Sequence, residues 1–388
     1  MFYIFNNIRN KEILLKAKNL NNDNDKNELK SMLFKLALEE GFNGNIWQSY
    51  VLYTLIFNEN PFTRAYERKK INQMFSLVSL DLLQYEKLYY TKVINDDEIY
   101  DFSLDITPSY VSLLIAKIKK DIEELSFKEA ILKFYFEYGV GDLAIYKAFR
   151  VENGTLYPIK NVREITFSDL IGYEKQKELL KENTLNFING KTYNNVLLYG
   201  DSGTGKSSSI QAILNEYYNY GLRIIEVYKH QMQEISKVIA SLKQRPYKFI
   251  ICMDDLSFED DEIEYKYLKS IIEGGIEPKP YNVVIYATSN RRHLIKESFL
   301  DNQSDDLHRN ETQAEKLSLA YRFGLQIYYS SLSVKEFRNM VLELASKNDI
   351  NIDEDILLKE ASAWEMTYGT LSGRCATQFI SYLKNKFE

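Results

Sequence analysis

The sequence predicts an α/β fold in which a parallel sheet, covered by helices on both faces, follows an all-helical N-terminal region. Five short β-rich runs separated by helical stretches indicate the sheet: 195–199, 222–227, 248–253, 282–288 and 325–329. Such alternation is typical of parallel sheets. Residues 1–150 show helical periodicity instead, and the pattern is helical again after residue 331. We therefore expect an N-terminal helical domain over 1–160, a core over 161–330 and a smaller helical region over 331–388.

The N-terminal region carries amphipathic helical patterns. Val78, Leu82, Tyr85 and Tyr89 recur at spacings of three and four, which places them on one helix face. Aromatic side chains at such positions indicate a core more than a platform for stacking bases, because aromatics tend to be buried. The segment 151–163 predicts the end of this region, since it contains an Asn-Gly turn signal and a proline that stops a helix.

Composition limits the classes of function. The chain has 388 residues and a net charge of −6, from 49 basic and 55 acidic side chains. This balance argues against nucleic acid as the partner without excluding it, because nonspecific binding needs an excess of cations. Two cysteines and three histidines lack zinc-ligand spacing. The N-terminus lacks a signal-peptide pattern and the apolar runs are too short to span a bilayer, so we expect a cytoplasmic protein with no membrane partner.

A phosphate-binding loop is the strongest motif. The run "YGDSGTGKSS" follows the β-rich run 195–199 and opens a helix, and it satisfies Gly-x4-Gly-Lys-Ser through Gly200, Gly205, Lys206 and Ser207. The glycines let successive N–H groups point into one concavity that holds phosphate oxygens. We expect Lys206 to reach the β- and γ-phosphates and Ser207 to ligate Mg²⁺.

Two aspartates follow the apolar run 248–253. As a buried central strand, this run would bring Asp254 to the edge where open α/β sheets bind ligands. We expect Asp254 to hold Mg²⁺ and Asp255 to orient a water molecule. Glu259 is the alternative candidate for the water, and the sequence does not decide between the two.

Three further residues have side chains suited to a γ-phosphate. Asn290 ends the next β-rich run, where its amide can hydrogen-bond the γ-phosphate and an attacking water. Arg322 in "AYRFGL" and Arg374 in "LSGRCATQF" supply permanently charged guanidinium groups, which suit the charge of phosphoryl transfer. An isolated arginine is more often a surface charge, so their order after the loop and the aspartates is what makes them candidates.

With these motifs in view, the chain resembles the AAA+ ATPases across about 164–388. The resemblance identifies Gly200–Ser207 (Gly200, Asp201, Ser202, Gly203, Thr204, Gly205, Lys206 and Ser207) with Walker A, and Asp254-Asp255 with Walker B. It likewise implies that Asn290 is sensor 1, Arg322 an arginine finger and Arg374 sensor 2. In "DLIGYEKQ", Ile171 and Gly172 would lie against adenine. More narrowly, "NNVLLYGDSGTGKSS" and "YATSNRRHLIKES" resemble a bacterial family of predicted AAA+ ATPases without an assigned role.

The resemblance implies a P-loop αβα core with a five-stranded parallel sheet, a C-terminal helical lid, and a homo-oligomer in which Arg322 acts on a neighbouring subunit. Asp255 departs from the superfamily pattern, because Glu is usual there. Two functions stay open. One is an ATPase that hydrolyses ATP with Mg²⁺ to remodel an unknown protein partner, and the other is a slowly hydrolysing switch that presents a partner surface when ATP is bound. A small-molecule kinase would leave Asn290, Arg322 and Arg374 without a purpose.

Overall fold

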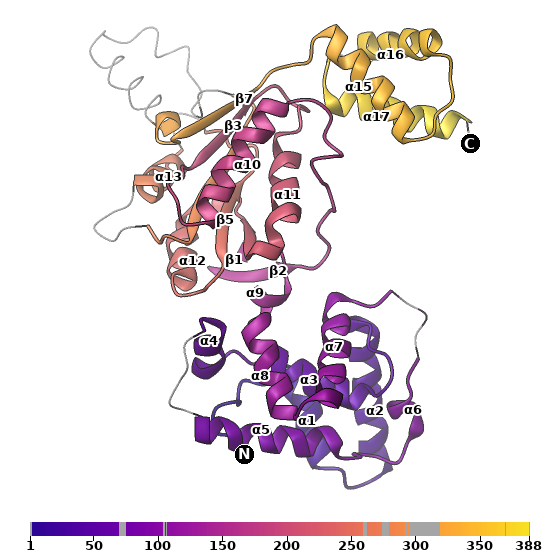
Figure 1. Cartoon of the computed structure of the whole chain (residues 1–388), viewed down its shortest axis with the longest axis vertical. Helices are drawn as coiled ribbons and strands as arrows, with labels where there is room; N and C mark the ends of the chain where they lie inside the picture. Colours follow the sequence, from indigo (N-terminus) through magenta and orange to yellow (C-terminus); the bar gives the residue numbers. More distant parts are fainter. Residues whose placement is uncertain are drawn as a thin grey trace. The chain divides into compact units, whose positions relative to one another are not determined.

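The computed structural model describes residues 2–69, 75–103, 105, 107–258, 262–273, 279–291, 294, 319–368 and 370–387. The chain divides into two compact units, Met1–Tyr146 and Lys147–Glu388. Figure 1 shows helices throughout the first unit, and a sheet followed by three helices in the second. Within the described ranges, no helix is both long enough and apolar enough to cross a membrane.

The first unit is helical, as predicted. Its helices are α1 (Lys11–Lys18), α2 (Asp23–Glu40), α3 (Ile46–Ile56), α4 (Pro61–Glu67), α5 (Phe75–Tyr90), α6 (Asp97–Tyr100), α7 (Tyr110–Glu124), α8 (Phe127–Glu137) and α9 (Asp142–Ile145). Ten of the eleven residues of α3 are buried. A helix that is buried all round belongs in the centre of a bundle, so α3 is the central helix of this unit.

The second unit contains a seven-stranded sheet in the order β2-β1-β4-β5-β6-β3-β7. The strands are β1 (Ala148–Glu152), β2 (Thr155–Ile159), β3 (Val196–Gly200), β4 (Leu222–Glu226), β5 (Lys248–Met253), β6 (Val283–Ser289) and β7 (Leu325–Tyr329). All neighbouring pairs are parallel except β1 with β2. The five predicted strands are therefore confirmed as a parallel set.

The predicted strand count of five is wrong, because β1 and β2 extend the sheet. The Asn153-Gly154 turn predicted from the sequence joins these two strands, and both of its residues have positive φ angles. Ala148 pairs with Ile224 of β4, which attaches the hairpin to the parallel set. The division between the two units consequently falls after Tyr146. Residues 148–152 and 155–159, which were expected in the helical domain, are strands of the sheet.

Helices α10 (Glu174–Ile188) and α11 (Lys206–Tyr217) lie side by side across one face of the sheet (Figure 1). Leu180 and Phe187 of α10 and Ile213 of α11 pack in one core with alternate residues of β3 to β7. In β4, β5 and β6 the intervening residues are also buried, whereas Tyr328 of the edge strand β7 is exposed. Strands buried on both faces read as continuous apolar runs, which is why the sequence revealed them. The unit also contains η1 (Tyr218–Tyr220), η2 (Lys229–Glu234), α12 (Ile235–Leu242) and α13 (Glu264–Glu273).

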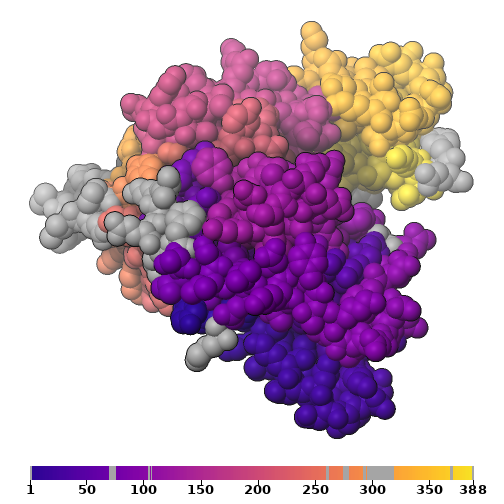
Figure 2. Space-filling model, turned by 60° about the horizontal axis from the view of Figure 1, so that its bottom comes forward, coloured from indigo at the N-terminus to yellow at the C-terminus, as the bar shows by residue number. Residues whose placement is uncertain are grey.

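The C-terminal helices α15 (Val334–Lys347), α16 (Glu354–Tyr368) and α17 (Gly373–Phe387) have a core of their own. Phe337 and Val341 of α15 pack there with Leu357 of α16 and Phe379 of α17. Figure 2 shows these helices as a distinct lobe, coloured yellow. We call this lobe the lid. Its residues Met340 and Leu344 contribute to the pocket described next.

Candidate functional site

The loop between β3 and α11 is shaped by glycine. Gly200, Gly203 and Gly205 all have positive φ angles, which L-residues with a Cβ rarely adopt. A Cβ on Gly200 would lie 2.0 Å from the backbone oxygen of Tyr329, and one on Gly203 would lie 2.9 Å from the Cβ of Arg374. Glycine is therefore required at both positions by close packing as well as by conformation.

Lys206 begins α11 and turns its ammonium back over the loop. Its Nζ donates to the backbone oxygens of Gly200 (2.9 Å) and Asp201 (2.7 Å) and to Oδ1 of Asn290 (3.1 Å). Burial lowers the pKa of Lys206. The positive charge of Lys206 is thus held within the loop, at the edge of the sheet where Asn290 follows β6.

Asp254, directly after β5, accepts two hydroxyl hydrogen bonds on one oxygen. Both Ser207 Oγ and Thr288 Oγ1 donate to its Oδ1, each at 2.5 Å. A hydroxyl and a carboxylate are oxygen donors of the kind Mg²⁺ prefers, and Mg²⁺ is usually held by one or two carboxylates together with substrate phosphates. Among the described residues, no group of three or more His, Cys, Asp or Glu could hold a metal alone. The donor set of Ser207 and Asp254 fits Mg²⁺ shared with a phosphate ligand.

Asp255 adopts a left-handed conformation, with φ of 50°. Its N–H donates to Thr288 Oγ1 at 2.9 Å, and its Oδ1 accepts from Asn290 Nδ2 at 2.7 Å. Thr288 therefore touches both aspartates, while Asn290 joins Asp255 to Lys206. A single hydrogen-bond network thus connects the ends of β5 and β6 to the start of α11.

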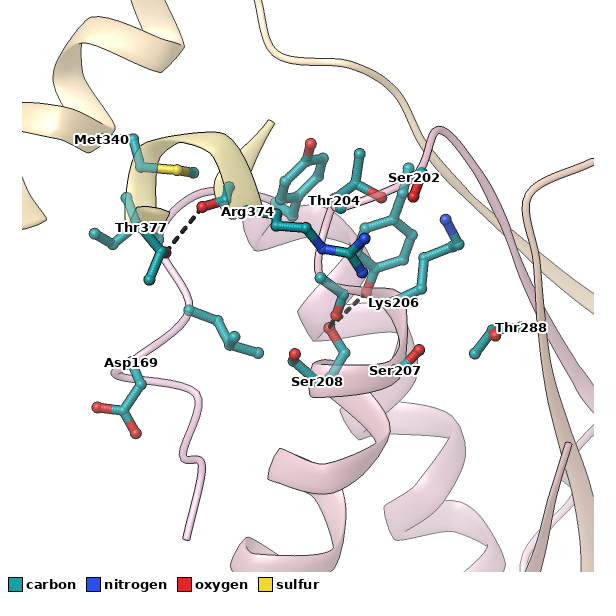
Figure 3. A pocket seen from close by; sticks show the side chains of 18 of the residues that line it. Asp169, Ser202, Thr204, Lys206, Ser207, Ser208, Thr288, Met340, Arg374 and Thr377 are labelled. Carbon is teal, nitrogen blue, oxygen red and sulfur yellow. Dashed lines mark hydrogen bonds between the residues drawn. The ribbon is translucent and has the colours of Figure 1, made fainter. Parts of the chain in front are cut away.

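These side chains border a pocket of about 640 Å³. Figure 3 shows Lys206, Ser207 and Thr288 on one side of it and Met340, Thr377 and Asp169 on the other. Of the predicted site residues, the pocket is lined by Ile171, Ser202, Gly203, Thr204, Gly205, Lys206, Ser207, Asp254, Asp255, Asn290 and Arg374. Gly172, Gly200 and Asp201 belong to the same segments but do not line this pocket.

Arg374 reaches the pocket from the lid. Its backbone N–H donates to the Gly203 oxygen at 3.1 Å, which fixes the start of α17 on the phosphate loop. Its guanidinium extends over the start of α11 (Figure 3). The charge of Arg374 contributes to lowering the pKa of Lys206, after burial as the main cause. Two cations that face one cavity favour an anionic ligand.

Arg322 is placed differently from the other predicted residues. Arg322 does not line the pocket, and its Nε and Nη2 both donate to Oε1 of Glu273, at 2.6 and 2.5 Å. Glu259 lies outside the described residues. The structure thus brings Asp255 into the network and holds Arg322 in an ion pair with α13.

The sequence analysis missed several residues of the pocket. Thr288 could have been found, because residues two apart on a strand point to the same face and Asn290 was already a candidate. Asp169 from the segment before α10, Lys177 from α10 itself, and Met340, Thr377 and Gln378 from the lid also line the pocket. They have no motif around them, so only tertiary packing reveals them.

The parallel sheet, the phosphate loop after β3 and the paired aspartates after β5 define the AAA+ class of P-loop proteins. More narrowly, the chain belongs to the family described as protein of unknown function (DUF815), which matches residues 144–387. This family assignment agrees with the resemblance seen in the sequence.

Two curated relatives each match about half of the chain. The Holliday junction branch migration complex subunit RuvB of Mycoplasmopsis pulmonis is 27% identical over 203 residues, covering 50% of this chain and 59% of that protein. The AAA-ATPase At2g46620 of Arabidopsis thaliana is 24% identical over 242 residues, covering 55% and 48%. The chain therefore spans less than two thirds of either relative.

Among solved structures, the Thermotoga maritima RuvB Holliday junction branch migration motor is 17% identical, with a TM-score of 0.33. The match covers 57% of this chain and 73% of that one. A second RuvB structure, of a mutant, has a TM-score of 0.36 at 15% identity, with the same coverage. The fold assignment above depends on the sheet and the loop themselves.

Proposed function

We propose that this chain binds ATP with Mg²⁺ in the pocket between the phosphate loop and the lid, hydrolyses it to ADP and phosphate, and uses the cycle to remodel a macromolecular partner. One observation carries the proposal. Lys206, Asp254, Asp255 and Asn290 form one network with Thr288 beside a cavity large enough for a nucleotide. Drug-sized ligands occupy cavities of roughly 300–1,000 Å³.

The loop residues would bind the triphosphate. Lys206 exchanges its bonds to the Gly200 and Asp201 oxygens for phosphate oxygens, and Arg374 approaches the same charge from the lid. Ser207 and Asp254 hold Mg²⁺, which neutralises charge on the phosphate oxygens. Because the lysine already sits at the loop, binding requires little rearrangement of the core.

Asp255 is the described residue best placed to orient the attacking water. Asn290 fixes one of its carboxylate oxygens at 2.7 Å, and the other makes no hydrogen bond within the described part of the chain. A base of this kind must lie within hydrogen-bond reach of the water. Aspartate is one methylene shorter than the usual glutamate, and this short reach favours slow turnover. The switch, in which ATP closes the lid and hydrolysis is slow, is therefore the second candidate function.

Assembly is the third part of the proposal. Arg322 does not line the pocket of its own chain, which supports its action on the nucleotide of a second copy. The N-terminal helical unit is a compact unit distinct from the one that carries the ATP site, and it is the part we assign to recognition of a protein partner.

Steady-state ATP turnover of the full chain, beside Lys206→Ala, Asp255→Asn and Glu259→Gln, tests the proposal. We expect loss of turnover in Lys206→Ala and Asp255→Asn and near-wild-type turnover in Glu259→Gln, which serves as the matched carboxylate control. If Glu259→Gln abolishes turnover while Asp255→Asn retains it, Glu259 is the residue that orients the attacking water. Wild-type turnover no higher than that of Lys206→Ala, together with tight ATP binding, would favour the switch, and absence of ATP binding would refute both functions.

A further inference from the structure

The carboxylate of Asp201 stands in the phosphate loop but faces away from the nucleotide pocket. Its Oδ2 accepts from the backbone N–H of Ser331 at 2.9 Å and from the Ser331 hydroxyl at 2.6 Å. These two hydrogen bonds lower the pKa of Asp201. Ser331 lies in the linker 330–333, between the end of β7 and the start of α15. Asp201 thus joins the loop to the linker that connects β7 to the lid.

The backbone of Asp201 is engaged on the nucleotide side. Its carbonyl oxygen accepts from Lys206 Nζ at 2.7 Å and from Thr204 Oγ1 at 2.8 Å, and its N–H donates to the Tyr329 oxygen at 3.1 Å. Lys206 is the residue expected to leave this carbonyl when phosphate binds. Any movement of the loop that accompanies this exchange therefore moves Asp201, whose side chain binds Ser331.

The linker is also hydrogen-bonded to the segment that precedes α17, the helix that carries Arg374. The N–H of Leu332 donates to the oxygen of Leu371 at 3.0 Å, two residues before α17 begins. Arg374 itself donates its N–H to Gly203 of the loop. The lid is consequently fastened to the loop at two points, Asp201 with Ser331 and Gly203 with Arg374.

We propose that Asp201 is a positioning residue that couples occupancy of the phosphate loop to the position of the lid through Ser331. This inference deepens the proposed function and rests on it, since it assumes that the loop binds ATP. It assigns the Asp201 side chain to the lid linker and leaves nucleotide contact to the backbone of the loop. The coupling sets how Arg374 is presented to the phosphates, so its loss affects turnover more than ATP affinity.

The chain offers a matched control for this pair. Glu336 Oε2 accepts from the Ser333 N–H at 2.8 Å and from the Ser333 hydroxyl at 2.6 Å, the same arrangement as Asp201 with Ser331. Both acids of this comparison have lowered pKa values for the same reason. Glu336, however, caps α15 inside the lid and makes no link to the loop. Glu336→Ala therefore removes an equivalent pair of hydrogen bonds without cutting the proposed connection.

Hydrogen–deuterium exchange of the full chain, with and without Mg²⁺ and a nonhydrolysable ATP analogue, tests the coupling. In the wild type we expect the analogue to increase protection of the loop 200–207 and of the linker 330–333. In Asp201→Ala, which removes the acceptor oxygen, the loop should respond and the linker should not. Ser331→Thr should behave as wild type because it keeps the hydroxyl, and Glu336→Ala should keep the linker response.

Kinetics supply the second readout. We expect Asp201→Ala to lower kcat about tenfold, the usual scale for losing a hydrogen bond to a charged group, with a much smaller change in KM. Ser331→Ala should lower kcat less, and the double variant should be no worse than Asp201→Ala alone, because both act on the same interaction. Additive losses in the double variant would contradict the pairing.

Three results overturn the inference. Linker protection in Asp201→Ala equal to wild type shows that the carboxylate does not transmit occupancy. Loss of loop protection in Asp201→Ala shows that the side chain serves nucleotide binding itself. If the analogue does not change protection of the loop even in the wild type, both the proposed function and this inference are wrong. This outcome differs from the first two, which require a normal loop response in the wild type.

Discussion

Thr288 holds both aspartates of the site through one hydroxyl, which donates to Asp254 and accepts from the Asp255 N–H. We predict that Thr288→Val lowers ATP turnover about tenfold, equivalent to ~1.4 kcal/mol, because one carboxylate loses a donor and one N–H loses its acceptor. Thr288→Ser should restore most of the turnover. The measurement is steady-state turnover at saturating ATP and Mg²⁺.

The matched control for Thr288→Val is Thr184→Val, which also deletes a buried threonine hydroxyl. Thr184 bonds the Leu180 oxygen and the Tyr286 hydroxyl in the core, away from the pocket. We expect this control to reduce the free energy of unfolding and to leave turnover per folded molecule unchanged. Equal losses of turnover in both variants would mean that Thr288 acts only through stability.

We expect that Gly200 cannot be replaced because a side chain there would clash with its neighbours. Gly190 is the comparison that isolates the cost of a positive φ angle, because a side chain there would meet no other atom. Both have positive φ angles, but a Cβ on Gly200 would lie 2.0 Å from the Tyr329 oxygen, whereas one on Gly190 would meet no atom within 4 Å. We predict that Gly190→Ala reduces the free energy of unfolding by about 1–2 kcal/mol, the cost of the left-handed conformation. Gly200→Ala should cost more and should also weaken binding of the ATP analogue. Urea unfolding and an analogue titration measure the two effects, and equal unfolding costs would refute the steric account.

How much of the site could be predicted depends on whether its residues are close in sequence. The loop Gly200–Ser207 and Asp254-Asp255 were predictable, because short motifs at strand ends specify their chemistry. Asp169 and Met340 were not, because a loop and a lid helix bring them to the pocket from distant parts of the chain. The pairing of Asp201 with Ser331 was not predictable either, since 130 residues separate the two.

Among the elements, the hairpin of β1 and β2 shows why apolar runs reveal central strands better than edge strands. β6 is buried along its whole length, while β2 is only partly buried and contains Pro158. Proline is tolerated at a sheet edge, where one side of the strand has no partner. The feature that marked 151–163 as a break in the sequence is therefore compatible with the edge strand that the structure contains.

The N-terminal cap of α15 is an element whose contribution should depend on pH. The Ser333 hydroxyl and N–H bind the Glu336 carboxylate and lower its pKa, so the folded state favours the ionised form. The resulting stabilisation is present above the pKa of Glu336 in the unfolded chain and is lost as pH falls through its lower pKa in the folded chain. We predict that Glu336→Gln lowers the midpoint of thermal unfolding at pH 7 and that this difference shrinks in acid. A difference independent of pH would contradict this account.

At the scale of the whole molecule, the ion pair of Arg322 with Glu273 must open before Arg322 can act on a second copy of the chain. The two nitrogens of Arg322 converge on a single Glu273 oxygen, with the arginine side chain 20% exposed and the glutamate 46% exposed. Such partly exposed pairs are worth at most about 1 kcal/mol, so assembly could readily break this one. The free energy needed to break the Arg322–Glu273 pair is therefore small enough for contacts with a second subunit to offset.

We predict that Glu273→Gln raises ATP turnover at low protein concentration by about two- to fivefold, because weakening a pair worth up to about 1 kcal/mol frees Arg322 for a neighbouring site. Turnover measured against protein concentration should converge with wild type once the protein is fully assembled. Glu264→Gln, at the other end of α13, is the control and should follow the wild-type curve. Arg322→Ala should abolish the gain when combined with Glu273→Gln. If Glu273→Gln and Arg322→Ala lower turnover alike at every concentration, Glu273 positions Arg322 for activity, and the idea that it restrains Arg322 before assembly is wrong.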